Sequence, residues 1–263
     1  MLRFAYSTIN WGAACDLPQA LAEIREAGWG AVELFGHALD HLGPQESLTV
    51  ALDGLVVATL FGSVTLPITE EQRVTHRQKI AYAAALGAAA YGIVGGQRLR
   101  YRPPTDAEYA ELSTFLEALA VDGAARGVAV SYHPHTGCTV ETAEETAILL
   151  RGTSALRLCL DASHIALVAE DPLATFEHFW DRIGYIHLKD WARGKFVELG
   201  QGTIGIDFPG LLRALDARGF AGWVVIENSR SDVSPLTSAR INAAYLTDLG
   251  YAIGRPSVPG VRR

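Results

Sequence analysis

The stretch of sequence that decides the fold is VAVSYHPHTGCTVETAEETAILLRGTSALRLCLD, residues 128–161. It opens with a β-branched and aromatic run, residues 128–133, which predicts a buried strand. An amphipathic segment at 142–150 predicts a helix, and a second apolar run at 156–161 predicts another strand. Two strands joined through a helix favour parallel pairing, because a parallel crossover is long and is usually helical.

The same alternation runs along the whole chain. Several predicted helices stop at a glycine shortly before the next strand, at Gly28, Gly87, Gly127 and Gly219, as expected for glycine at a helix C-terminus. The least regular segment, 37–53, predicts only one short helix. The expected strands are residues 4–9, 31–35, 55–60, 91–94, 128–133, 156–161, 185–188 and 223–227. The expected helices are residues 17–27, 70–86, 106–126, 142–150, 172–180, 208–218 and 236–249.

Eight strand–helix units in 263 residues predict an α/β fold, a single (β/α)8 TIM barrel with right-handed crossovers. We expect one domain over residues 1–263, because no linker or change in composition divides the chain. The alternative is a doubly wound open sheet. Such a sheet normally carries a glycine-rich phosphate turn after its first strand, and STINWGAAC at 7–15 is not one.

Composition and charge exclude several classes of protein. Hydrophobic residues make up 49% of the chain and charged residues 19%, so a disordered chain is excluded. A net charge of −7 argues against a nucleic-acid partner. Neither a signal peptide nor a membrane-spanning run is evident, so no membrane partner is expected. Three widely spaced cysteines without a CxxC pair favour a reducing compartment, and we expect a cytoplasmic protein.

Polar residues collect where the predicted strands end. Asp161, His187 and Glu227 end three successive strands, and in a TIM barrel such ends meet at one mouth. Each residue alone has a plain structural explanation: a helix cap, a buried histidine or a surface charge. Those separate explanations do not account for the position of all three residues at the same end of successive strands. Two carboxylates and an imidazole form an oxygen-rich set that suits one divalent metal ion, Mn²⁺ or Mg²⁺ first, with Co²⁺ or Zn²⁺ as alternatives.

Five phrases carry a resemblance to a known family: AVELFG, YHPHTGCTVET, LCLDASH, YIHLKD and LGQGTIGIDFPGLLRALDARGFAGWVVIEN. They resemble the sugar phosphate isomerase/epimerase family, the xylose-isomerase-like TIM barrels, over essentially the whole chain and most densely at 128–228. The nearest branches are inosose-dehydratase-like and hydroxypyruvate-isomerase or ketose-epimerase-like. As a set the motifs are fairly specific for the family, and they are weak for any one substrate.

The resemblance implies a metal held by Glu, Asp, His and Glu from strands five to eight. Asp161, His187 and Glu227 match these positions, and we carry Glu141 over as the fourth ligand. Strand five itself carries no acid on the expected face, because alternation places Ser131, His133 and His135 there. The first acid is Glu141, beyond the turn that follows the strand. Two alternatives stay open: Glu141 caps the following helix, or a strand-five histidine replaces it.

The resemblance also implies an isomerase or epimerase that removes a proton α to the carbonyl of a keto-sugar or related polyol ketone. The intermediate would be a metal-stabilised enediolate, with Glu141 and Glu227 as the acid–base pair. An inosose-type dehydratase is the alternative, with His133 or His135 as general acid. A DNA-repair endonuclease is disfavoured by the acidic charge, and a non-catalytic sugar-binding barrel is less expected still. The expected partner is a small sugar or cyclitol, and assembly into a homo-oligomer is left open. Expected substrate-binding residues are His133, His135, His164, Lys189, Glu33, Asn10 and Arg230.

Overall fold

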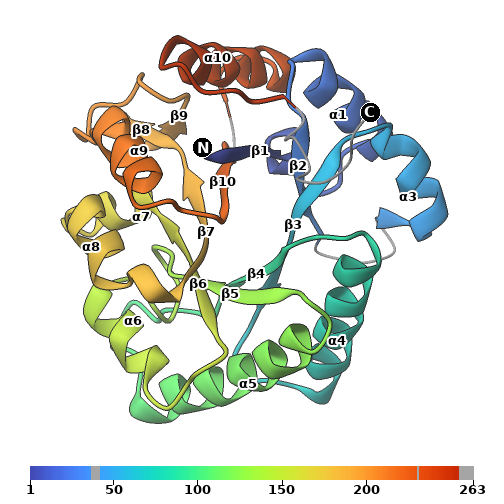
Figure 1. Cartoon of the computed structure of the whole chain (residues 1–263). Helices are drawn as coiled ribbons and strands as arrows, with labels where there is room; N and C mark the ends of the chain where they lie inside the picture. The colour runs from blue at the N-terminus through green and yellow to red at the C-terminus, as the bar shows by residue number, and fades with distance from the viewer. Residues whose placement is uncertain (37–41, 230, 255–263) are drawn as a thin grey trace.

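The chain forms a closed barrel of eight parallel strands, ordered β1-β10-β7-β6-β5-β4-β3-β2 (Figure 1). The computed structural model describes residues 1–36, 42–229 and 231–254. Barrel closure joins β1 to β10, with Arg3 opposite Trp223 and Tyr6 opposite Ile226. The predicted (β/α)8 barrel is therefore confirmed, and the open sheet is excluded. The barrel strands are β1 Arg3–Ser7, β2 Ala31–Phe35, β3 Val56–Val64, β4 Ala90–Gly95, β5 Ala129–His133, β6 Arg157–Asp161, β7 Ile183–Leu188 and β10 Trp223–Ile226.

Helices surround the barrel and connect its strands. They are α1 Leu17–Glu26, α3 Gln45–Leu52, α4 Glu70–Ala85, α5 Asp106–Ala124, α6 Ala143–Leu150, α7 Ala162–Leu167, α8 Pro172–His178, α9 Phe208–Ala217 and α10 Pro235–Asp248. The short helix expected within 37–53 is α3, and residues 37–41 of that segment lie outside the described residues. None of the helices in the described ranges is both long and apolar enough to cross a membrane.

Local sequence explains where the helices begin. At α5 the side chain of Thr105 accepts from the backbone amide of Glu108, and the Glu108 side chain accepts from the Thr105 amide. Thr142 and Glu145 form the same reciprocal pair at the start of α6. This capping box satisfies amides that the first helical turn leaves free. It also shows that the N-cap of α6 is Thr142, so the capping role considered for Glu141 is wrong.

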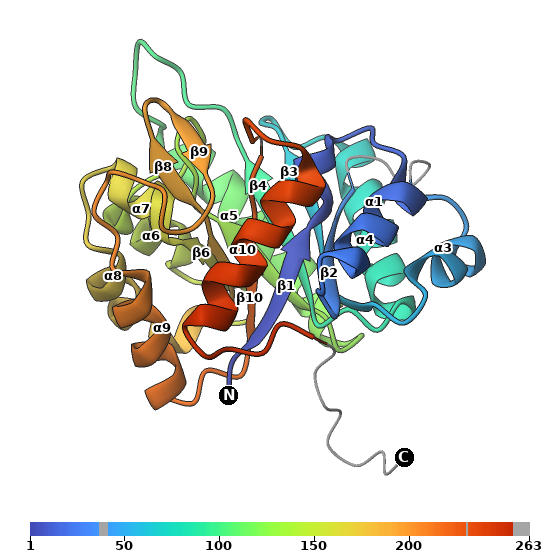
Figure 2. The ribbon, with the colours of Figure 1, turned by 90° about the horizontal axis from the view of Figure 1, so that it is seen from above.

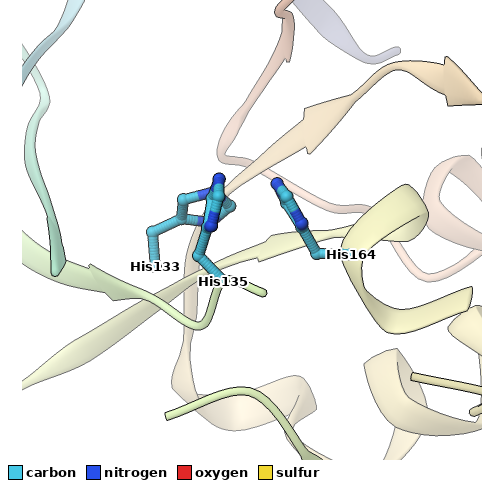
Figure 3. Close-up of side chains that lie close together, drawn as sticks. All are labelled: His133, His135 and His164. Carbon is cyan, nitrogen blue, oxygen red and sulfur yellow. The ribbon is translucent and has the colours of Figure 1, made fainter. Parts of the chain in front are cut away.

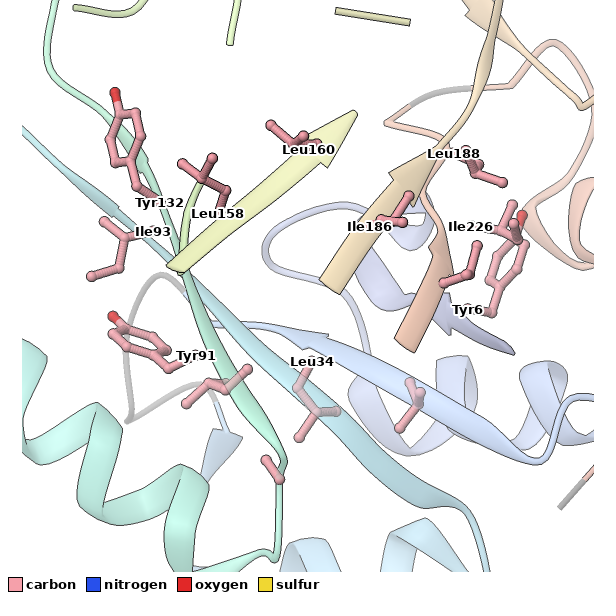
Figure 4. Packing of buried hydrophobic residues seen from close by; sticks show 14 of the residues in the cluster. Tyr6, Leu34, Tyr91, Ile93, Tyr132, Leu158, Leu160, Ile186, Leu188 and Ile226 are labelled. Atoms are coloured by element: carbon pink, nitrogen blue, oxygen red, sulfur yellow. The ribbon is translucent and has the colours of Figure 1, made fainter. Parts of the chain in front are cut away.

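Each barrel strand presents alternate residues to its two faces. The outward residues, such as Leu34, Ile93, Leu158 and Ile226, pack with the surrounding helices in one large apolar cluster (Figure 4). The inward residues form a smaller cluster of mostly compact side chains, including Ala31, Cys159 and Val225. Two residues further along these strands the inward positions become polar. The alternation therefore separates an apolar barrel floor from a polar mouth.

The carboxyl ends of the strands carry additional structure. β8 (Asp190–Ala192) and β9 (Lys195–Val197) form an antiparallel hairpin directly after β7. Figure 2 shows this hairpin and the loop between β4 and α5 rising at one end of the barrel, away from the N-terminus. The side chain of Asp190 holds the segment after the hairpin, because its Oδ2 accepts from the amides of Gly200 and Gly202 at 3.1 and 2.8 Å. These segments border the mouth where the polar side chains lie.

Candidate metal centre

Five polar side chains occupy the inner wall at the barrel mouth, and we call them the site ring. They are Glu33 on β2, His133 on β5, Asp161 on β6, His187 on β7 and Glu227 directly after β10. All five are buried. The predicted convergence of Asp161, His187 and Glu227 is therefore present in the structure.

Four members of the site ring form a set of potential metal ligands. One ligand atom from each of His133, Asp161, His187 and Glu227 lies within 4.8 Å of the others. One buried atom of this set, His133 Nε2, has no hydrogen-bond partner among the described residues, while Asp161 Oδ2 lies 3.2 Å from Lys189 Nζ and His187 Nδ1 lies 3.3 Å from Glu227 Oε2. Buried polar atoms rarely stay unpartnered. Two imidazoles and two carboxylates at this spacing fit a divalent cation.

Glu33 orients His187 for this role. The Nε2 atom of His187 lies 3.0 Å from Glu33 Oε2, which also accepts from the hydroxyl of Thr59 at 2.7 Å. A carboxylate that accepts from one ring nitrogen leaves the other nitrogen free to bind a metal. Glu33 is fully buried under His187. The structure thus gives Glu33 a contact that orients His187, and its role in substrate binding stays a prediction.

Lys189 brings a positive charge to the same set. Its Nζ lies 3.2 Å from Asp161 Oδ2 and bonds the Oε2 atom of Glu227. It also lies 4.4 Å from the centre of the Phe196 ring on the β8–β9 hairpin. Asp161 and Glu227 share this one ammonium, and with Glu33 the site holds three buried carboxylates, so a divalent cation would neutralise negative charge that Lys189 does not balance.

Burial and these ion pairs shift the pKa values of the site. Burial alone would raise the pKa of Glu227, but Lys189 and His187 hold it well below its ordinary value. Burial would lower the pKa of Lys189, but Asp161 and Glu227 raise it. Burial lowers the pKa of His133 and of His164 well below the ordinary histidine value. Near neutral pH the Glu227 carboxylate is thus ionised, Lys189 charged and His133 neutral. Burial would lower the pKa of His187, but Cys159, Glu33 and Glu227 raise it well above its ordinary value, so a metal ion would displace a proton from this residue.

The structure does not bring Glu141 to this group. Glu141 lies in the loop between β5 and α6, where its Oε2 is 3.1 Å from Arg98 Nε and its Oε1 accepts from the amide of Gly137. An arginine outside the ring pairs with its carboxylate, so Glu141 is not among the four converging ligand residues, and its roles as metal ligand and acid–base group stay predictions. His133, the substitute that the sequence left open, is the fourth residue of the set whose potential ligand atoms lie within 4.8 Å of one another.

The remaining predicted residues lie around the mouth. His135 and His164 face each other with ring centres 3.7 Å apart. Asn10 is buried, donates to the Tyr6 hydroxyl at 3.2 Å and leaves its Oδ1 without a partner. Arg230 lies outside the described residues. No contact of these side chains with a substrate is on record, so their binding roles stay predictions.

Sequence reasoning missed several residues that complete the site. Thr59, which bonds Glu33, is a single hydroxyl inside an apolar strand and gave no separate signal. Tyr185 and Cys159 sit two residues before His187 and Asp161 and form the floor beneath them. The alternation of the strands, followed inward from each predicted ligand, is the signal that finds them.

Comparison with known proteins places the chain in a family. A sequence profile of the xylose isomerase-like TIM barrel matches residues 21–249, so the chain belongs to that family. This confirms the resemblance that the motifs indicated.

Several curated relatives are similar over different lengths. An inosose dehydratase of Lacticaseibacillus casei is 29% identical over 60% of this chain, and the match spans 62% of that relative. The rhizopine catabolism protein MocC of Rhizobium meliloti is 28% identical over 96% of this chain and 90% of its own length. Among solved structures, an L-ribulose 3-epimerase superposes with a TM-score of 0.79 at 20% identity, covering 95% of this chain and 94% of the other. At that identity the structural likeness shows the fold.

Proposed function

We propose that this protein is a metal-dependent enzyme that removes a proton α to the carbonyl of a sugar or cyclitol ketone. The observation that carries the proposal is the buried set His133, Asp161, His187 and Glu227 at the barrel mouth. In (β/α)8 enzymes the chemistry lies at this end of the barrel. A divalent ion in such a set supplies a Lewis acid for the carbonyl oxygen of the substrate.

Three side chains of the protein have separate roles in this reaction. Glu227 stays ionised beside Lys189, and it is the carboxylate that accepts the proton from the carbon next to the carbonyl. Lys189 stays charged and stabilises the negative charge that develops on the substrate oxygen. Glu33 keeps His187 in one orientation throughout.

The geometry favours elimination of water as the second half of the reaction. An epimerase must return a proton to the opposite face, and the residue expected to do so, Glu141, is bound to Arg98. The mouth instead holds imidazoles. His164 Nδ1 lies 3.1 Å from the Thr136 hydroxyl, which can donate to it and leave a proton on Nε2. That proton joins the β-hydroxyl as its C–O bond breaks, water leaves, and the C–H electron pair becomes the new C=C bond. The proton taken up by Glu227 is then released to solvent, and His164 regains one from solvent, which restores both groups.

The curated relatives named inosose dehydratases support this choice, and an inosose is a cyclic polyol ketone of the proposed class. The isomerase or epimerase function is the second candidate, because it shares the first step and the same metal site. Two imidazole ligands make Mn²⁺, Co²⁺ or Zn²⁺ better suited than Mg²⁺. Three free cysteines fit the proposed cytoplasmic location.

A two-part assay tests the proposal. Protein loaded with Mn²⁺ is incubated with a panel of inososes and keto-sugars in D2O, and the substrates are followed by mass spectrometry. Exchange of the α-hydrogen reports the shared first step, loss of the mass of water identifies a dehydratase, and an unchanged covalent formula with altered retention identifies an isomerase or epimerase. Absence of both exchange and turnover across the panel would contradict the proposal.

A further inference from the structure

A second group of potential metal ligands adjoins the site ring, and it consists of histidines alone. His133 ends β5, His135 follows it in the turn, and His164 lies on α7. One ring nitrogen from each lies within 4.8 Å of the other two. Figure 3 shows the three side chains converging from β5 and α7, with the rings of His135 and His164 side by side. We call this group the histidine triad.

Each ring of the triad is held through its Nδ1 atom. His133 Nδ1 lies 3.0 Å from the carbonyl oxygen of Cys159, and His135 Nδ1 lies 2.7 Å from that of Thr136. His164 Nδ1 lies 3.1 Å from the Thr136 hydroxyl. A carbonyl oxygen can only accept, so His133 and His135 carry their proton on Nδ1 and have a bare Nε2. Metal-binding histidines in proteins are oriented in this way.

The free nitrogens have no other partner. The Nε2 atoms of His133 and His164 are buried without a hydrogen bond among the described residues, and both side chains are about 1% exposed. His135 is partly buried and gives access from the mouth. Buried imidazole nitrogens without partners are costly unless something binds them.

We infer that the histidine triad is a second metal site, which takes a borderline cation such as Zn²⁺ through three imidazole nitrogens. Three histidines with an open fourth position are a known coordination set for Zn²⁺. Such an all-nitrogen set suits Zn²⁺, Ni²⁺ or Cu²⁺, whereas Mn²⁺ prefers oxygen ligands. Zn²⁺ binds histidine nitrogens at about 2.0–2.1 Å, and His135, the partly exposed member of the triad, is the side chain with room to move toward an ion.

The two sites share His133, and this makes them competitors. His133 has one free nitrogen, so it serves either the triad or the set with Asp161, His187 and Glu227. A Zn²⁺ ion in the triad therefore leaves three ligands for the other ion and occupies the Nε2 atom of His164. Occupation of the triad should weaken Mn²⁺ binding and inhibit the enzyme.

The test titrates Zn²⁺ into protein that already holds one equivalent of Mn²⁺. Calorimetry measures Zn²⁺ uptake, and the electron paramagnetic resonance signal of free Mn²⁺ reports displacement. We expect the wild-type chain to bind a Zn²⁺ ion before its Mn²⁺ is fully released. His135→Gln and His164→Gln should weaken that event about 100-fold or more, since changes around a metal site already cost 10–100-fold. Both variants should still take up one Mn²⁺ ion.

His178→Gln is the matched control, because His178 is an exposed histidine on α8. It should bind Zn²⁺ as the wild type does. Zn²⁺ uptake that is unchanged in both triad variants would overturn the second site. This result does not bear on the proposed reaction, which is assayed with Mn²⁺ in zinc-free buffer.

Discussion

The site ring and the residues beneath it occupy equivalent places on the same strands. Two residues before Glu33, His133, Asp161, His187 and Glu227, the inward positions hold an inner belt of Ala31, Ser131, Cys159, Tyr185 and Val225. Both layers are buried. All five side chains of the ring are titratable: three are carboxylic acids and two are histidines. The belt contains no side chain that is charged at neutral pH.

The difference shows that inward-facing residues only two positions apart on the same strand have different roles: the belt residues stabilise the fold, and the ring residues form the candidate metal site. The belt is packed so closely that Gly92 on β4 has room for no side chain: a Cβ there would lie 1.8 Å from the hydroxyl of Tyr185. The ring above it instead brings potential ligand atoms of four side chains within 4.8 Å of one another. A mutation in the ring should thus affect metal and turnover, and one in the belt should affect folding.

The largest expected effect separates the layers at β10. Glu227→Gln keeps the shape of the side chain but removes a ligand charge and the proton acceptor, so turnover should fall on the order of 10²-fold or more. Activity and metal content are measured at saturating Mn²⁺. Glu71→Gln, an exposed change on α4, is the control and should retain both. Normal turnover in Glu227→Gln would remove this residue from the mechanism.

Gly92→Ala tests the belt. The added methyl group meets Tyr185 and Phe61, so the free energy of unfolding should drop by about 1–3 kcal/mol or more. Denaturant unfolding of the metal-free protein measures this change. Gly87→Ala, where open space surrounds the new Cβ, controls for loss of glycine, although its φ of +72° adds some strain. If Gly92→Ala is as stable as the wild type, the side chains of Tyr185 and Phe61 can move to make room for the methyl group, and the belt is not closely packed.

Glu33→Gln sharpens the comparison within the ring. Gln no longer offers a charged acceptor to His187 Nε2, so the His187 orientation loosens while every ligand atom remains. We expect Mn²⁺ affinity to fall about 10–100-fold with little change in fold. Calorimetry measures the Mn²⁺ affinity of the wild type and of Glu33→Gln. An unchanged affinity would mean that Glu33 does not orient His187 for metal binding.

The smallest effect concerns acid stability and lies outside both layers. Burial, together with Lys79, lowers the pKa of His76 on α4 to about 4, and its Nδ1 lies 2.7 Å from the Tyr91 hydroxyl. Below pH 6.5 His76 takes up a proton in the unfolded chain, whereas in the folded chain it stays neutral until the pH approaches 4. Stability is therefore complete above pH 6.5 and declines toward pH 4, by at most about 1.4 kcal/mol per pH unit for this group.

Urea unfolding at several pH values, compared between wild type and His76→Gln, isolates this contribution. The variant should lose less stability than the wild type over the same interval. Equal slopes would show that His76 is protonated in the folded chain.

Strand periodicity predicted the barrel and three ring residues because these depend on local patterns. All eight barrel strands fall within a few residues of their expected positions. The sequence could not choose between Glu141 and a strand-five histidine as fourth ligand, because Glu141 pairs with Arg98, which lies in a different loop and gives no local signal. The β8–β9 hairpin was missed since its strands are three residues each, too short for a periodic signal. The Glu33–His187 pair joins residues 154 apart and has no local signature.

Closure of the barrel between β1 and β10 has a kinetic consequence. The pairing joins the first strand to a strand more than 200 residues later, so its loop entropy is overcome late in folding. Glu227 follows β10 directly. During synthesis the ligand set therefore stays incomplete until nearly the whole chain has emerged, and tight metal capture would mark the moment at which the barrel has closed.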